Sequence, residues 1–442
     1  MSATMQQVAD LMRQYHEDVA NVLGRAETGS LADLKELEES VVAQLQAIDG
    51  FSLEVQRELD HLPLRVLFSW LDGGNARISE STIIERCDQL FGERRAWLEQ
   101  YKRYRSTQEA IVLTVLTWQC EIRCTYCTIP KQSGREVSTE VLDQATDLLL
   151  SAPKQNLQMR YFGGEPLMEW DKLTHSIETT WNKAHHSDRC NGKNLSFLIT
   201  TNGIQLDEEK IKWLSRFPVR LQIALDGLPE AQDTHRRFVD SDESSYARSA
   251  IHKAAMLKEY GVPHTVILVV HPARIDFMLE DFQHIVDKGF EIIQINWAHN
   301  TIWHRDHLDG FAKGLHKLGL YLRERWREGK GPKLRNLNET KLKVRLAQEL
   351  TVDWDGRIYP NTSFLFRPHI ADNVRLGSLS DGRNWLHYKI NYFNTAELGE
   401  ESYAPKVFDN NAQVGTIFNH WIRWMADQGI PNVDELISTT YR

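Results

Sequence analysis

The sequence predicts an α/β fold: a partial (β/α)6 barrel with a helical unit before it and a small α+β cap after it. Residues 1–108 show only helical periodicity, residues 109–305 alternate strand-like and helix-like runs, and residues 306–442 lose that alternation. Alternating strands and helices are typical of right-handed βαβ units around a parallel sheet. We therefore expect a helical accessory domain, a barrel domain and a C-terminal domain with these bounds.

The composition restricts the class of protein. A chain of 442 residues with 41% hydrophobic and 26% charged residues is typical of a globular protein with more than one domain. A net charge of −9 without a basic tract argues against nucleic acid as the main partner. No apolar run is long enough for a membrane span, and the N-terminus lacks the apolar core of a signal peptide. Five cysteines, three of them clustered, do not form a disulfide framework, so we expect a reducing, cytoplasmic location.

The first 108 residues predict helices. Residues 8–23 and 31–48 repeat apolar side chains three and four positions apart, as one face of a helix does. Cys87 falls on a similar pattern, where we expect an inert core thiol.

The barrel elements follow in order. Short β-rich runs predict six strands, at 110–118, 157–162, 195–201, 219–225, 264–270 and 291–297. Helical runs lie between them, at 138–151, 207–217, 246–261 and 278–289. The C-terminal part predicts a helix over 308–329, a hairpin over 350–362 with its turn at Asp355-Gly356, and a helix over 415–431.

Polar motifs follow the predicted strands. In a parallel barrel the carboxyl ends of the strands share one face, so loops after different strands meet there. The motifs are Cys120-x-x-x-Cys124-x-x-Cys127, Gly163-Gly164-Glu165-Pro166, Thr200-Thr201-Asn202-Gly203, Ala224-Leu225-Asp226-Gly227 and Val269-Val270-His271-Pro272. That all five motifs are expected at the same end of the sheet is stronger evidence for a functional site than any single motif.

The three cysteines have three interpretations. Thiolates on one short loop can bind an iron–sulfur cluster, and three of them leave one iron of a cubane open. Structural zinc normally needs four ligands, and Cys190 has no second cysteine near it. Unremarkable thiols are the third possibility, and the cysteines alone leave all three open.

The neighbouring loops have structural and functional interpretations too. Gly163 and Gly164 would let the backbone approach a ligand, and Glu165 would accept a hydrogen bond from an ammonium group. A tight turn closed by Pro166 is the alternative. Asn202 suits ribose hydroxyls, and an Asn-Gly turn is the alternative explanation.

Taken together, these motifs resemble the radical S-adenosylmethionine (radical SAM) superfamily over residues 110–300, with Tyr126 at the aromatic position of the cysteine signature. The resemblance implies one [4Fe–4S] cluster on Cys120, Cys124 and Cys127, with S-adenosylmethionine (SAM) on the open iron. Reductive cleavage of SAM would give a 5′-deoxyadenosyl radical that abstracts a substrate hydrogen. The implied SAM-binding residues are Tyr126 near the adenine, Gly163, Gly164, Glu165 near the methionine amine, Pro166, Thr201, Asn202 near the ribose, Asp226 and Arg236.

Within that superfamily, residues 224–237 resemble the SPASM/twitch subgroup, which modifies peptides and proteins. Leu228 and Gln232 replace the usual Pro and His, and Arg236 is expected to pair with the carboxylate of SAM. The segment from 352 also resembles the opening of a SPASM domain. Asn361 stands where relatives place their first auxiliary-cluster cysteine, and no cysteine follows Cys190, so we expect no auxiliary cluster.

Substrate contacts are expected at the rim of the barrel. The candidates are His271, Trp297, His299, Trp303 and His304, with His307 nearby; aromatic packing is the alternative explanation. We expect a radical SAM enzyme that matures a ribosomal peptide and takes electrons from a donor such as flavodoxin or ferredoxin. The alternatives are small-molecule tailoring, a non-catalytic iron–sulfur sensor and a zinc-binding interaction protein.

Overall fold

The computed structural model describes residues 108–299, 301–337, 349–365, 375–382 and 405–427, with isolated positions between 11 and 47 and at 371, 385 and 388. The predicted helical domain at 1–108 lies almost entirely outside these residues, as does Cys87. The proposed domain bounds therefore stay a prediction. No described helix is both long and apolar enough to cross a membrane.

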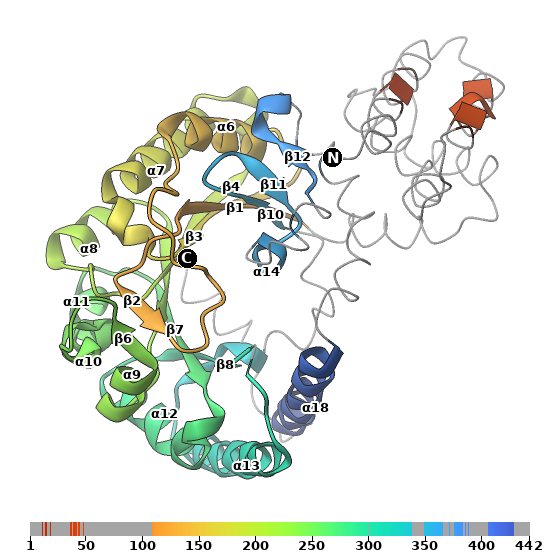
Figure 1. The fold of residues 1–442 in the computed structure, drawn as a ribbon. Coiled ribbons are helices and arrows are strands. Elements are labelled where there is room, and N and C mark those ends of the chain that lie inside the picture. The colour runs from red at the N-terminus through yellow and green to blue at the C-terminus, as the bar shows by residue number, and fades with distance from the viewer. Residues whose placement is uncertain are drawn as a thin grey trace.

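A ten-stranded sheet forms the centre of the described chain (Figure 1). Six parallel strands follow one another in sequence order, and helices cover their outer side. They are β1 (Glu109–Thr117), β3 (Asn156–Gly163), β4 (Asn194–Thr201), β5 (Val219–Ala224), β7 (His264–Val270) and β8 (Ile292–Trp297). All six predicted strands are confirmed to within one residue, and the sheet remains an open partial barrel.

The strand sequences explain which face each side chain takes. β1 is buried along its length after Glu109, as expected for a central parallel strand covered on both faces. β3 and β5 instead alternate buried and half-buried residues. The half-buried set in β3 includes the polar Gln158 and Arg160, so one face of this part of the sheet is polar.

The helices follow their predicted places with one exception. α6 (Thr139–Leu150), α8 (Glu208–Leu214), α12 (Met278–Asp287) and α13 (Arg305–Arg327) match the predicted runs, and α7 (Trp170–His185) adds a further outer helix. The run at 246–261, predicted as one helix, divides into α10 (Ser245–Arg248), the 3-10 helix η3 (Ala250–His252) and α11 (Ala254–Glu259). Ser249 breaks it, because its backbone is extended and its side chain caps the new turn by accepting from the amide of Ile251.

The C-terminal segments extend the same sheet. β10 (Glu349–Val352) pairs parallel with β1. β11 (Arg357–Tyr359) pairs antiparallel with β10, which confirms the predicted hairpin. Gly356 at the turn has a φ of 82°, a conformation that favours glycine. β12 (Gly377–Ser378) joins β11, and β9 (Lys333–Leu334) joins β8 at the opposite edge. The pairing of β10 with β1 was not predicted.

The last described helix, α18 (Pro405–Asp427), packs on α13. Gly319 permits the close approach, because a Cβ there would lie 2.6 Å from the Trp424 ring and 3.0 Å from Nε1 of Trp421. This helix confirms the position of the predicted C-terminal helix, apart from residues 428–431, which lie outside the described chain.

Candidate active site

The cysteine loop leaves the carboxyl end of β1. A short strand, β2 (Ile122–Cys124), pairs antiparallel with β6 (Arg236–Phe238) and places Cys124 opposite Arg236. The amide of Cys127 donates to the carbonyl of Cys124 at 3.1 Å, which turns the chain back. All three cysteines of the motif are free, half-buried thiols. Sequence reasoning missed the small β2–β6 sheet, because three-residue strands give no periodic signal.

The Gly-Gly-Glu motif hydrogen-bonds to the start of this loop. The amide of Gly164 donates to the carbonyl of Thr117 at 2.7 Å, and that of Glu165 donates to the carbonyl of Gln119 at 2.8 Å. A Cβ on Gly164 would lie only 1.8 Å from the carbonyl oxygen of Gln119. Glycine is therefore required for contact with the chain's own backbone, and this contact holds Glu165 beside Cys120. Pro166 then begins the 3-10 helix η1 (Pro166–Glu169).

Glu165 is fully buried and accepts three hydrogen bonds. The donors are the hydroxyl of Thr201 at 2.6 Å and the amides of Asn202 at 2.7 Å and Leu167 at 3.0 Å. Burial, together with the negative charge of Glu121, raises the pKa of Glu165 to about 7. Because these three donors are neutral, a cationic ligand group would stabilise the ionised carboxylate.

Asn202 connects β4 to the cysteine loop. Its side-chain amide donates to Sγ of Cys120 at 3.7 Å, and its Oδ1 accepts from the amide of Ile204 at 2.9 Å. The observed contact is thus with the thiol, and the contact with ribose stays a prediction.

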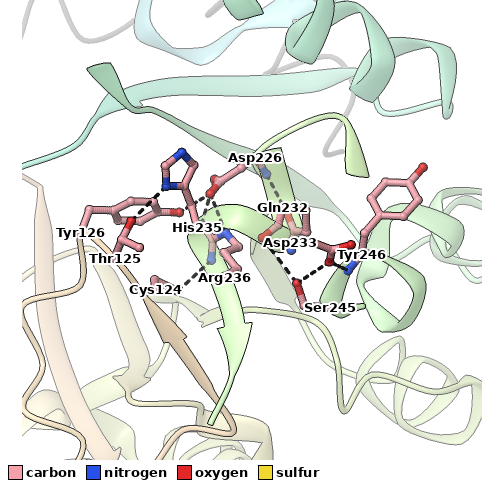
Figure 2. A network of polar contacts seen from close by, with 10 residues as sticks. All are labelled: Cys124, Thr125, Tyr126, Asp226, Gln232, Asp233, His235, Arg236, Ser245 and Tyr246. Carbon is pink, nitrogen blue, oxygen red and sulfur yellow. Dashed lines mark hydrogen bonds and ion pairs between the residues drawn. The ribbon is translucent and has the colours of Figure 1, made fainter. Parts of the chain in front are cut away.

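Asp226, at the end of β5, organises a buried network (Figure 2). The hydroxyl of Tyr126 donates to its Oδ2 at 2.5 Å, and Nη2 of Arg236 donates to its Oδ1 at 3.1 Å. Nη1 of Arg236 donates to Sγ of Cys124 at 3.6 Å, and Nε lies 3.0 Å from Oδ2 of Asp226. Both terminal guanidinium nitrogens therefore donate within the chain, whereas Nε, although close to Asp226, makes no hydrogen bond. The pairing of Arg236 with the SAM carboxylate stays a prediction.

The charges in this network reinforce one another. Burial alone would lower the pKa of Arg236, but the neighbouring Asp226 and Tyr126 outweigh it and hold the pKa well above its usual value. Gln232, which replaces the expected His, accepts from the amide of Asp226 at 3.0 Å. Asp233 accepts from the amide of Tyr246 at 2.8 Å and so ties α9 (Pro229–His235) to α10 (Figure 2).

His235 and His271 form a pair next to Tyr126. Their ring centroids are 4.2 Å apart, and Nδ1 of His235 lies 3.1 Å from the hydroxyl of Thr125. Burial lowers the pKa of both rings, that of His271 to about 4, so both are neutral near neutral pH. They line a cavity of about 10 Å³, room for about one water, with Asp226, Arg274 and Asp281. The sequence did not single out His235, because it ends a helical run. Its ring comes near the site because the next residues form β6, which pairs with β2 beside the cysteines.

A larger groove of about 780 Å³ opens to solvent beside the cysteine loop. Cys124, Cys127, His235 and His271 line it, and so do three cationic side chains, those of Arg123, Lys131 and Arg237. Its volume lies within the range of ligand sites in proteins.

The other predicted substrate residues lie on or near α13. Trp303 is fully buried, donates to the carbonyl of Ala298 at 3.2 Å and packs on Phe311. His304 caps α13 together with His307. Trp297 packs between His299 and Phe418 of α18, with ring centroids 5.3 Å and 5.5 Å away. Of the predicted substrate set, the structure brings His271 into contact with the Tyr126–His235 group.

The donor set suits a cluster of several irons. Burial raises the pKa of Cys120 to about 12 and also raises that of Cys124, so their thiolates need positive charge beside them. In the described part of the chain, no three His, Cys, Asp or Glu side chains converge as the ligands of a single ion would. Thiolates of a cubane each bind a different iron and need not converge. Asn202 and Arg236 already donate to two of the sulfurs, as donors around a cluster do.

The structure thus combines an open parallel sheet, a three-cysteine loop after its first strand and, beside that loop, a Gly-Gly-Glu loop with a buried carboxylate. Residues 114–287 match the family model described as the radical SAM superfamily, so this part of the chain is a radical SAM domain.

Two of the curated relatives carry names of enzymes, a peptide cyclase and a sulfatase-maturating enzyme. The chain is 26% identical to PqqA peptide cyclase of Gluconobacter oxydans over 192 residues, 42% of this chain and 48% of that protein. It is 24% identical to the cysteine-type anaerobic sulfatase-maturating enzyme of Clostridium perfringens over 185 residues, 40% of this chain and 48% of that protein. The chain thus spans about half the length of the curated relatives it matches.

Solved structures share the fold. Native anSMEcpe with bound AdoMet and a peptide superposes with a TM-score of 0.57 at 16% identity, over 72% of this chain and 99% of that one. A tagged form of the same protein with bound AdoMet has a TM-score of 0.54 at 19% identity, over 63% of this chain and 80% of that one.

Proposed function

We propose that this protein is a radical SAM enzyme that modifies a peptide. One observation carries the proposal: the backbone of the Gly-Gly-Glu loop is hydrogen-bonded beside Cys120, so that a buried carboxylate and three free thiols meet at one end of the sheet. The family match over residues 114–287 supports the same chemistry.

In this proposal, Cys120, Cys124 and Cys127 hold one [4Fe–4S] cluster. When bound and reduced by a donor such as flavodoxin or ferredoxin, the cluster supplies the electron that splits SAM into methionine and a 5′-deoxyadenosyl radical, which abstracts a substrate hydrogen. Glu165 receives the ammonium group of SAM, and Tyr126 contacts the adenine. The unpaired thiols suit a reducing cytoplasm.

The surrounding side chains orient these groups. Asn202 and Arg236 donate hydrogen bonds to the sulfurs of Cys120 and Cys124, which stabilises negative charge on them. Nδ1 of His271 accepts from the amide of Ala273, so its proton is carried on Nε2, where it can be donated. The rings of His235 and His271 lie beside Tyr126, with ring centroids 6.4 Å and 6.5 Å away, and would limit the access of water to the radical.

A peptide is the favoured substrate class. The groove beside the cysteines is open and of a size that suits an extended chain, and two relatives carry names of peptide- or protein-modifying enzymes. Small-molecule tailoring is second, because it would be better served by a sealed cavity. Substitution of His271 by Gln should then leave SAM cleavage intact but abolish product.

The test is anaerobic reconstitution with iron, sulfide and reductant. We expect about four irons per chain, because a single cubane holds that number. The iron should be lost on Cys120→Ala, Cys124→Ala or Cys127→Ala and kept on Cys190→Ala, since Cys190 is buried on the cavity at the amino ends of β3 and β4. About eight irons would contradict the absence of an auxiliary cluster.

Activity is tested with SAM and candidate peptides, first those encoded beside the gene. Mass spectrometry should find 5′-deoxyadenosine and a change in peptide mass. Reconstituted protein that releases no deoxyadenosine with any substrate would contradict the proposal and favour a sensor of iron–sulfur status.

A further inference from the structure

Glu121, the residue after Cys120, has a carboxylate that no described side chain or backbone group pairs with. Its carbonyl accepts from the amide of Val239 at 2.9 Å, which fixes the backbone at the start of β2. Both side-chain oxygens are shielded from solvent, and neither has a hydrogen-bond partner among the described residues. Buried polar groups in native proteins are nearly always paired, and a buried charge needs an opposite charge. The position therefore calls for a donor that the described residues do not supply.

A second carboxylate lies close to it. The negative charge of Glu121 acts on Glu165, whose three hydrogen-bond donors are all neutral. The amide of Glu165 is bonded to the carbonyl of Gln119, two positions before Glu121. The two carboxylates thus flank Cys120 from two loops, and a cation between them would relieve their repulsion.

We propose that Glu121 is a positioning residue for SAM: with Glu165 it receives the positively charged methionine end of that molecule. The inference rests on the proposed function. The methionine end of SAM carries an ammonium and a sulfonium group, and carboxylates in a buried site bind such groups strongly. Arg236 cannot serve the same purpose, because it has the wrong charge and is paired with Asp226.

The test compares Glu121→Gln with the wild-type holoenzyme. Gln keeps the size of the side chain and removes its charge. Equilibrium binding is measured anaerobically for SAM and for 5′-methylthioadenosine, which has the adenosine part but neither positive group. We expect the SAM dissociation constant to rise about tenfold, as loss of one charge-assisted hydrogen bond does, and that of methylthioadenosine to change by less than about twofold. The EPR signal of the reduced cluster should need correspondingly more SAM for its perturbation.

Glu243→Gln is the matched control, because Glu243 is an exposed carboxylate on the loop after β6. It should bind both molecules as the wild type does. An unchanged SAM affinity in Glu121→Gln, or an equal loss for both molecules, would overturn the inference.

Glu121→Asp covers the case in which the Gln variant fails to hold its cluster. Asp keeps the negative charge, but its side chain is one methylene shorter and holds the carboxylate farther from the ligand. The affinity for SAM should therefore fall more than the affinity for methylthioadenosine. Loss of the cluster in both variants would also overturn the inference, since it would assign Glu121 to cluster binding. Wild-type holoenzyme that binds no SAM would instead refute the proposed function.

Discussion

At the scale of single residues, Arg236 joins the site to the fold. Its side chain is only 4% exposed, and its guanidinium contacts Asp226, on the β5 loop, and Cys124, on the cysteine loop. Sequence reasoning selected Arg236 from its motif, but its partner could not be predicted, because the pairing depends on β6 lying against β2. The same holds for His235 and Glu121, whose contacts arise only when distant loops meet.

Arg236→Ala should destabilise the cluster-free protein by about 3–5 kcal/mol, because it leaves the carboxylate of Asp226 buried without an opposite charge. Urea unfolding under anaerobic conditions measures this. Arg237→Ala is the control: Arg237 is exposed, and its loss should change stability by less than about 0.5 kcal/mol. Similar values for the two variants would show that the Arg236–Asp226 pair contributes nothing.

At the scale of elements, the C-terminal hairpin is attached to the strand that carries the cysteine loop. β10 pairs with β1. Trp118, two residues before Cys120, donates from Nε1 to Oδ1 of Asp353 at 2.9 Å. The hairpin itself was predictable from its Asp-Gly turn. Its place beside β1 was not, because the strand pattern carries no information about which edge accepts it.

Asp353 should make stability depend on pH. Burial raises the pKa of Asp353 from 3.8 to about 6, so the folded state holds this proton more tightly than the unfolded state does. The resulting stabilisation is complete below the unfolded-state pKa of 3.8 and is lost as the pH rises through the folded-state pKa of about 6. Between about pH 4 and about pH 7 this amounts to about 2 kcal/mol. Asp353→Asn keeps an acceptor for Trp118 and should remove this part of the pH dependence in urea unfolding. Parallel pH profiles for the two proteins would contradict the prediction.

Gly164→Ala should damage the contact between β3 and the cysteine loop. The new Cβ would overlap the carbonyl of Gln119, at a cost of about 3 kcal/mol, and the variant should also bind less iron. Gly415→Ala is the control, since its Cβ would make an ordinary 3.6 Å contact with Trp297. Thermal unfolding and iron analysis measure both effects; wild-type values for Gly164→Ala would refute the explanation.

At the scale of the whole molecule, the fold class was predictable and the closing contacts were not. Six strands were located to within one residue because alternating apolar runs and helices repeat regularly along the chain. The helix over 308–329 was likewise predicted, but not that Gly319 lies under Trp421 and Trp424 of α18. Contacts between helices so far apart in the sequence depend on how their side chains fit together, which the local pattern of apolar residues does not reveal.

Gly319→Val should separate α18 from α13. Its side chain would collide with the Trp424 ring and reduce stability by about 1–3 kcal/mol, with faster amide exchange in α18. Leu320→Ala, at an exposed position on the same helix, should have a much smaller effect. Unaltered exchange in α18 would show that this contact does not hold the helix.

The pairing of β10 with β1 also has a consequence for synthesis of the protein. The ribosome completes the three thiols by residue 127, but among the described residues the partner of the outer edge of the first strand, residues 349–352, emerges much later. A bare edge invites aberrant pairing. Metal loading should accordingly be safest after translation has finished, when the final hairpin has closed over the strand that bears the thiols.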